Sequence, residues 1–78
     1  MVDPMSDVPV YVQLADLLRR QIATGELQPR RPIPSIRHLQ QTYGVSDGTV
    51  KKAVQVLRDE GLVRTVPGRG VYVIDPSA

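Results

Sequence analysis

The stretch that decides the fold is residues 34–74, PSIRHLQQTYGVSDGTVKKAVQVLRDEGLVRTVPGRGVYVI. Two short segments in it carry apolar residues at helical spacing and flank Gly44-Val45-Ser46. Two β-rich runs joined by a glycine-containing turn follow these segments. With one more helix before it, this order predicts a mainly α domain with a small β-hairpin, the three-helix winged helix-turn-helix fold.

Local signals mark the ends of the two helices in this stretch. Ser35 stands at an N-cap position, Gly44 supplies the turn, Ser46 caps the next helix and Gly61 closes it. The positions expected to be buried are Ile36, Leu39 and Tyr43 in the first of these helices and Val50, Ala53, Val54 and Leu57 in the second. We therefore expect the helix-turn-helix over about residues 36–55.

The hairpin, called the wing below, is expected over about residues 62–74. Its two strands are the runs 62–66 and 71–74, and the turn between them is Pro67-Gly68-Arg69-Gly70. The outer face of the preceding helix is left with Gly48, Lys52, Gln55 and Asp59, flanked by Thr49 and Lys51. This outer face is the surface that a partner would meet.

The part of the chain before residue 34 supplies the first helix. Pro9 suits the first turn of this helix, and Gly25 ends it. Its apolar stripe consists of Val10, Tyr11, Leu14, Leu17, Leu18 and Ile22. Residues 26–34 contain three prolines and are expected to form a connection, with Ile33 in a short strand. The expected division of the chain is a flexible tail at 1–7, the winged domain at 8–74 and a second tail at 75–78.

The composition limits what the chain can do. Its 78 residues give room for one domain with a modest core, which must be mainly aliphatic because Phe and Trp are absent. There is no cysteine, a single histidine, no carboxylate pair placed in a pocket and no phosphate-binding glycine loop. The sequence therefore predicts no enzyme, no cofactor and no metal site. No apolar run is long enough to cross a bilayer, which favours a cytoplasmic protein without a membrane partner.

Positive charge is concentrated in one part of the chain. Residues 17–70 carry all ten Lys and Arg against four carboxylates, a net charge of +6, whereas residues 1–16 carry three aspartates and no cation. The basic part coincides with the predicted helix-turn-helix and wing. This distribution favours a nucleic acid as the partner, because phosphate contacts would be needed there.

Several short fragments of the chain occur in an order and spacing that are typical of one protein family. They are Tyr11-Val12-Gln13-Leu14-Ala15, Pro34-Ser35 with Arg37 and Leu39, Gly44-Val45-Ser46, Thr49-Val50, Leu57 with Glu60-Gly61-Leu62-Val63, and Gly68-Arg69-Gly70-Val71-Tyr72-Val73. As an ordered set they resemble the DNA-binding domain of the GntR family of bacterial transcription regulators. The resemblance covers the chain from Val8 to Ile74.

The resemblance implies a sequence-specific binder of double-stranded DNA, most often a repressor, that acts as a homodimer on a palindromic operator. It implies that Arg37 grips phosphate, that the start of the third helix reads bases in the major groove, and that the wing approaches the backbone or the minor groove. The DNA-binding residues expected on this basis are Arg37, Ser46, Asp47, Gly48, Thr49, Lys51, Lys52, Gln55, Gly68, Arg69 and Gly70.

Two of these residues depart from the family pattern. Asp47 and Lys51 both stand where the family usually has an arginine. An aspartate at a helix N-terminus interacts favourably with the helix dipole, by about 0.3–1 kcal/mol, which favours a capping role for Asp47. In the alternative, Asp47 reads a base, because a carboxylate can accept a hydrogen bond from cytosine N4.

A second class of function stays open. Winged-helix domains also serve as protein–protein modules, and Asp47 and Gly48 weaken the DNA-facing surface. The alternative is therefore an accessory module of a replication, partition or conjugation complex. A continuous basic face through Arg37, Lys51, Lys52 and Arg69 would favour DNA. The sequence shows no small-molecule effector site, and it is compatible with either a minimal regulator or an excised domain.

Overall fold

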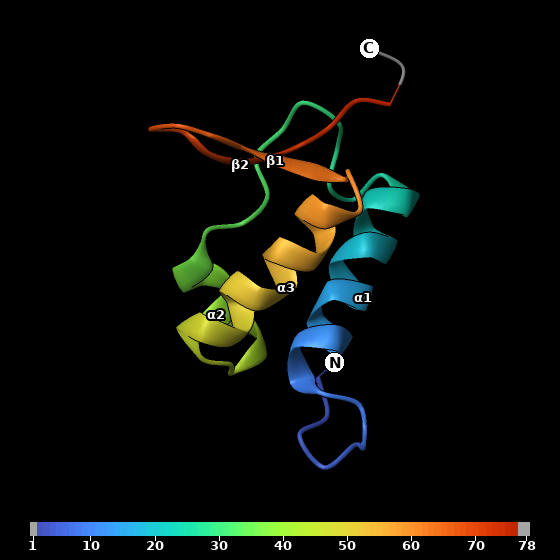
Figure 1. Cartoon of the computed structure of the whole chain (residues 1–78), viewed down its shortest axis with the longest axis vertical. Helices are drawn as coiled ribbons and strands as arrows, with labels where there is room; N and C mark the ends of the chain where they lie inside the picture. The colour runs from blue at the N-terminus through green and yellow to red at the C-terminus, as the bar shows by residue number, and fades with distance from the viewer. Residues whose placement is uncertain (1, 77–78) are drawn as a thin grey trace.

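The computed structural model describes residues 2–76 and contains three helices followed by a hairpin (Figure 1). The elements are α1 (Val10–Thr24), α2 (Ile36–Tyr43), α3 (Asp47–Asp59), β1 (Val63–Val66) and β2 (Gly70–Val73). α3 packs against both α1 and α2, and the hairpin follows at the end of α3. The predicted winged helix-turn-helix architecture is confirmed.

The core is aliphatic and is centred on α1 and α3, as the composition predicts. Its members are Leu14, Ala15, Leu18, Ile33, Leu39, Val50, Ala53, Val54, Leu57, Val63 and Val73. Within residues 2–76 no polar or charged residue is buried. The prediction that Ile36 is buried is wrong: 37% of this residue is exposed, because it is the first residue of α2 and lines a groove described below.

The structure confirms the predicted helix ends at Ser35, Ser46, Gly25 and Gly44. Gly61, predicted to close α3, directly follows its C-cap and has a positive φ. Ser35 Oγ accepts a hydrogen bond from His38 N at 3.1 Å, and Ser46 Oγ accepts one from Thr49 N, also at 3.1 Å. Gly44 ends α2 in the left-handed conformation, with φ of 65°. Pro9 lies one residue earlier than expected: its extended ψ of 143° makes it the N-cap of α1, and the helix begins at Val10.

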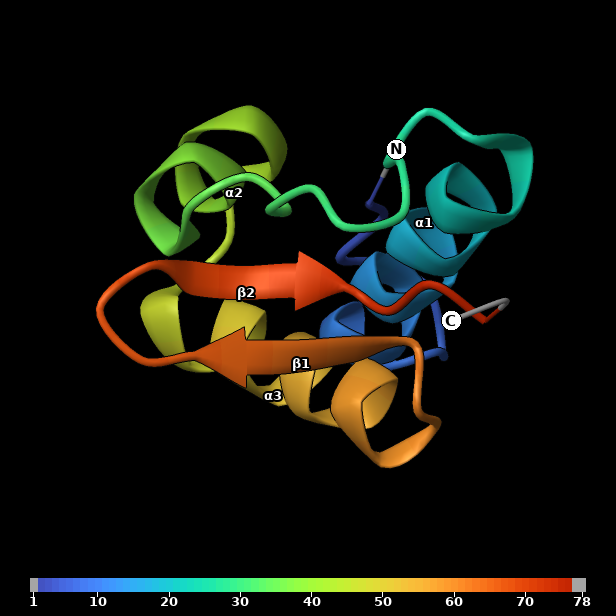
Figure 2. The same cartoon turned by 90° about the horizontal axis from the view of Figure 1, so that it is seen from above.

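The wing is a two-stranded antiparallel hairpin to which a third segment is added. Val66 pairs with Gly70, so the turn has three residues rather than the predicted four, and Gly70 begins β2. On the other side of β2, Ile33 N donates to Val71 O at 2.8 Å and Val73 N donates to Arg31 O at 3.0 Å. Figure 2 shows this segment, residues 31–33, running beside β2. The pairing is a single isolated bridge between Pro32 and Tyr72, so the short strand predicted around Ile33 is reduced to this bridge and the hydrogen bonds beside it.

The segment before α1 is folded back on that helix. Asp3 N donates to Gln13 Oε1 at 2.7 Å, and Gln13 Nε2 donates to the carbonyls of Asp3 and Val8, each at 2.8 Å. Ser6 N and Met5 N also bond to Asp3. The part of the expected tail that the structure describes therefore has local structure, which Gln13 organises.

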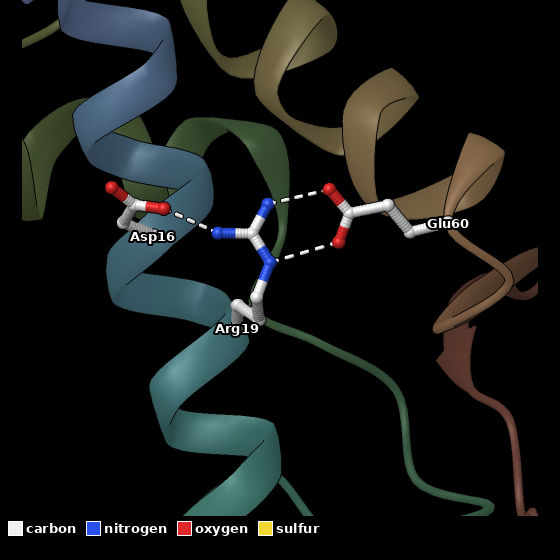
Figure 3. A network of polar contacts seen from close by, with 3 residues as sticks. All are labelled: Asp16, Arg19 and Glu60. Atoms are coloured by element: carbon white, nitrogen blue, oxygen red, sulfur yellow. Dashed lines mark hydrogen bonds and ion pairs between the residues drawn. The ribbon is translucent and has the colours of Figure 1, made fainter.

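One ion-pair network joins α1 to the end of α3 (Figure 3). Arg19 donates from Nε to one oxygen of Glu60 at 2.8 Å and from a terminal nitrogen to the other at 2.6 Å, and it also pairs with Asp16. The hydrogen bonds that Arg19 donates to Glu60 lower the pKa of the Glu60 carboxyl and raise the pKa of the Arg19 guanidinium above its usual value. This bidentate pair fixes the C-terminal end of α3 against α1.

The Arg19–Glu60 pair predicts a specific pH dependence of stability. The pKa of Glu60 is lower in the folded state than in the unfolded chain. The pair therefore contributes to the free energy of unfolding above the ordinary glutamate pKa, and this contribution is lost as the pH falls through the pKa of the folded state. We expect wild type to unfold at a higher temperature than Glu60→Gln at pH 7, and the difference to shrink towards pH 3. Thermal unfolding followed by circular dichroism measures it, with Glu26→Gln as the matched control. A difference that stays constant with pH would contradict the assignment.

Candidate nucleic-acid interface

A groove of about 820 Å³ lies between the start of α2, the exposed side of α3 and the wing. Its apolar wall is formed by Pro32, Ile33, Pro34, Ile36, Leu39, Val54 and Val71. Its cations are Arg37 from α2, Lys51 and Arg58 from α3, and Arg69 from the turn of the wing. No carboxylate lines this groove, which we call the cationic groove. Four cations over an apolar wall concentrate positive potential there.

The groove brings together residues that are far apart in the sequence. Of the site residues predicted from the sequence, it contains Arg37, Lys51, Gln55, Arg69 and Gly70. Gly68 lies in the turn of the wing beside them. Three of the four cations of the predicted basic face therefore lie in one groove.

Lys52 is the exception among the predicted cations. Its Nζ lies 4.5 Å from the centroid of the Tyr11 ring, which belongs to α1. An ammonium group over an aromatic face is attracted by the ring quadrupole. Lys52 therefore lies on the α1 side of α3 and does not line the groove.

Arg58 lines the groove but was not among the residues predicted from the sequence. It donates from a terminal nitrogen to Gln55 Oε1 at 2.7 Å, and Gln55 Nε2 in turn donates to Asp59 Oδ1 at 2.8 Å. Its buried Nε has no hydrogen-bond partner within residues 2–76. The signal that could have identified it is its spacing: Arg58 follows Lys51 by seven residues and so lies on the same side of the helix.

The start of α3 is exposed beside the groove. Ser46, Asp47 and Gly48 are all exposed, and Ser46 donates from its hydroxyl to Thr49 Oγ1 at 2.9 Å. Asp47 Oδ2 lies 3.0 Å from Lys51 Nζ, one turn further along the helix. The N-cap of α3 is Ser46, and Asp47 lies in the first turn, where its carboxylate interacts favourably with the helix dipole and also pairs with Lys51.

The three glycines predicted to lie in the site differ in their conformation. Gly68 and Gly70 have φ of 73° and 117°, so the turn of the wing itself requires glycine at both positions. Gly48 has ordinary helical backbone, and a Cβ built on it meets no atom within 4 Å. Nothing within the described chain therefore explains a glycine at position 48.

Between residues 2 and 76 no three His, Cys, Asp or Glu side chains are grouped so that they could hold a metal ion. No helix in this range has the length and apolar character needed to span a membrane. The cationic groove and the exposed start of α3 are the features that distinguish this surface.

The fold is that of a winged helix-turn-helix domain, with three helices followed by a hairpin whose turn contains glycine. The cationic groove lies beside the exposed N-terminal end of α3. The model of the bacterial regulatory proteins of the gntR family matches residues 10–73, which is most of the chain. The chain therefore belongs to the GntR family.

Curated relatives and solved structures agree with this membership. The chain is 40% identical over 75 residues to the transcriptional repressor NagR of Bacillus subtilis, covering 96% of this chain and 31% of NagR. It is 41% identical over 69 residues to the repressor MngR of Escherichia coli, covering 88% of this chain and 29% of MngR. The chain thus spans about a third of the length of these relatives.

Two solved structures are similar over nearly the whole chain. YtrA from Sulfolobus acidocaldarius, a GntR-family transcription factor, superposes with a TM-score of 0.86 at 41% identity, covering 96% of this chain and 79% of that one. The DNA-binding domain of AraR in complex with operator ORR3 superposes with a TM-score of 0.81 at 32% identity, covering 94% and 92%.

Proposed function

We propose that this chain is the sequence-specific DNA-binding domain of a transcription regulator that acts as a repressor. The observation that carries the proposal is the cationic groove, with four cations and no carboxylate, beside the exposed start of α3. The names of the relatives support it, since NagR and MngR are both repressors and the AraR domain was solved with operator DNA.

In the proposed complex α3 enters the major groove with its N-terminal end. Its inner face is committed to the core through Val50, Ala53 and Leu57. This leaves the outer face, with exposed Gly48 and half-buried Thr49, for base edges. The wing would lie at the backbone or the minor groove, with Arg69 at its turn. The DNA strand between the two grooves would then pass over the cationic groove.

The groove cations are proposed to hold the DNA backbone. Arg37 lies in the first turn of α2, with a planar guanidinium suited to phosphate, and Lys51 and Arg69 face the same groove. Arg58, which lines the same groove, would join them. Lys52 is assigned instead to the contact with Tyr11. Two copies related by a two-fold axis would bind an operator whose sequence is palindromic.

The test of this function is binding to duplex DNA at varied salt. We expect selection from genomic fragments to return specific sites, and log affinity to fall linearly with log salt. Arg37→Ala should weaken binding to every sequence by about tenfold and reduce the salt slope by about one, because one phosphate contact is lost. Arg20→Ala, an equal charge change on the exposed side of α1, is the matched control. Binding that ignores salt would exclude the proposed function.

Gly48 provides a second prediction, in which stability and binding change in opposite directions. Gly48→Ala should raise the free energy of unfolding by about 0.5–1 kcal/mol, because alanine is favoured in a helix and its Cβ meets no atom here. It should at the same time weaken DNA binding, because the methyl group would occupy the surface proposed to meet the bases.

Urea unfolding and duplex titration measure the two effects of Gly48→Ala. Gly70→Ala is the matched control for stability: its φ of 117° makes it strained, so the same substitution should destabilise the fold. A Gly48→Ala variant that is more stable and binds DNA as wild type does would remove position 48 from the interface.

A further inference from the structure

The exposed carboxylate of Asp47, which pairs with Lys51 at the start of α3, is the feature that the proposed function leaves unused. Asp47 Oδ2 and Lys51 Nζ are 3.0 Å apart, and their side chains are 53% and 64% exposed. Because Ser46 already caps the helix, the carboxylate of Asp47 is not needed for that purpose. Its second oxygen, Oδ1, forms no hydrogen bond with any residue from 2 to 76. The pair therefore presents a free acceptor at the start of α3.

Charge determines whether such an acceptor can approach DNA. A carboxylate without a cationic partner at the start of α3 would be repelled by the phosphates on both sides of the major groove. With Lys51 in contact, the pair has no net charge, and Coulomb repulsion falls accordingly. Lys51 thus acts as the neutralising partner that makes a carboxylate tolerable at this position.

The chemistry of base edges determines what the free oxygen can accept. In the major groove cytosine presents the N4 amino group, whereas guanine presents only the acceptors N7 and O6, and thymine presents O4. Adenine presents the N6 amino group, but its neighbouring N7 is an acceptor that faces a carboxylate unfavourably. A neutralised carboxylate therefore prefers cytosine, accepts adenine less well and disfavours guanine and thymine.

We propose that Asp47, neutralised by Lys51, is a specificity-determining residue that selects cytosine at one base position under the start of α3. This inference rests on the proposed DNA-binding function. It assigns the chain a preference opposite to that of an arginine at the same position, which would donate to guanine. It also changes the expected role of Lys51 from a phosphate contact to a partner of Asp47.

The first experiment is selection from a random duplex pool with wild type, Asp47→Ala and Asp47→Asn. We expect wild type to favour cytosine over guanine and thymine by roughly tenfold at one position of each half-site. Asp47→Ala should lose the preference at that position and keep it elsewhere. Asp47→Asn should shift it to adenine, because an amide pairs with N6 and N7 together.

The control for this selection is Glu26→Ala, which removes an equal charge from an exposed position outside α3. It should return the wild-type sequence. If Asp47→Ala returns the wild-type sequence as well, or if wild type enriches guanine or thymine at that position, the inference is wrong and the proposed function stands. If wild type enriches no sequence at all, both are wrong.

The second experiment tests the neutralising role of Lys51 on duplexes that lack the selected site. Asp47→Ala should strengthen binding by only about twofold when Lys51 is present, but by roughly tenfold in a Lys51→Ala background, where the carboxylate is left bare. Equal gains in the two backgrounds would show that the residues act independently and would overturn the pairing. Circular dichroism confirms that each variant is folded before it is titrated.

Discussion

The rest of this small domain depends on α3, which has one side buried in the core and the other exposed. Val50, Ala53 and Leu57 are fully buried against α1 and the sheet, so one side of the helix is committed to the core. No polar or charged residue is buried within residues 2–76, and packing of aliphatic side chains must therefore hold α3 in place. Because that packing allows one rotation of the helix only, it also decides which residues remain on the open side. The surface of α3 that is proposed to meet DNA therefore consists of the residues that the core leaves exposed.

The cationic groove exists because the connection between α1 and α2 joins the sheet. Ile33 is buried and donates its N–H to Val71, so the chain enters α2 directly from the edge of β2. Arg37 follows four residues later and is thereby held on the same groove as Arg69, which lies in the turn beside β2. A connection that left the sheet earlier would separate these two cations. Residues 31–33 thus link the wing to the helix-turn-helix.

The sequence predicts the parts that local chemistry determines. The caps at Ser35 and Ser46 and the turn at Gly44 depend on neighbouring residues, so they can be recognised without a structure. Contacts between distant residues leave no such signal: the bond from Arg19 to Glu60 spans 41 positions. Ile36 was misplaced because helical spacing marks a face, but only tertiary packing shows whether a terminal residue on that face is covered. The Asp47–Lys51 pair was visible in principle, since i,i+4 neighbours meet on any helix.

In the proposed complex, the groove cations determine how strongly DNA is bound, whereas Asp47 discriminates between sequences. Cations in a groove attract every duplex equally, so they raise affinity without information about bases. A carboxylate at the start of α3 has the opposite effect, because it weakens binding wherever the base edge offers no donor. Placing Asp47 beside Lys51 limits that loss to the wrong bases, since the pair is neutral towards phosphate. Specificity is a difference of affinities, and a residue that penalises wrong sequences increases it as surely as one that rewards the right sequence.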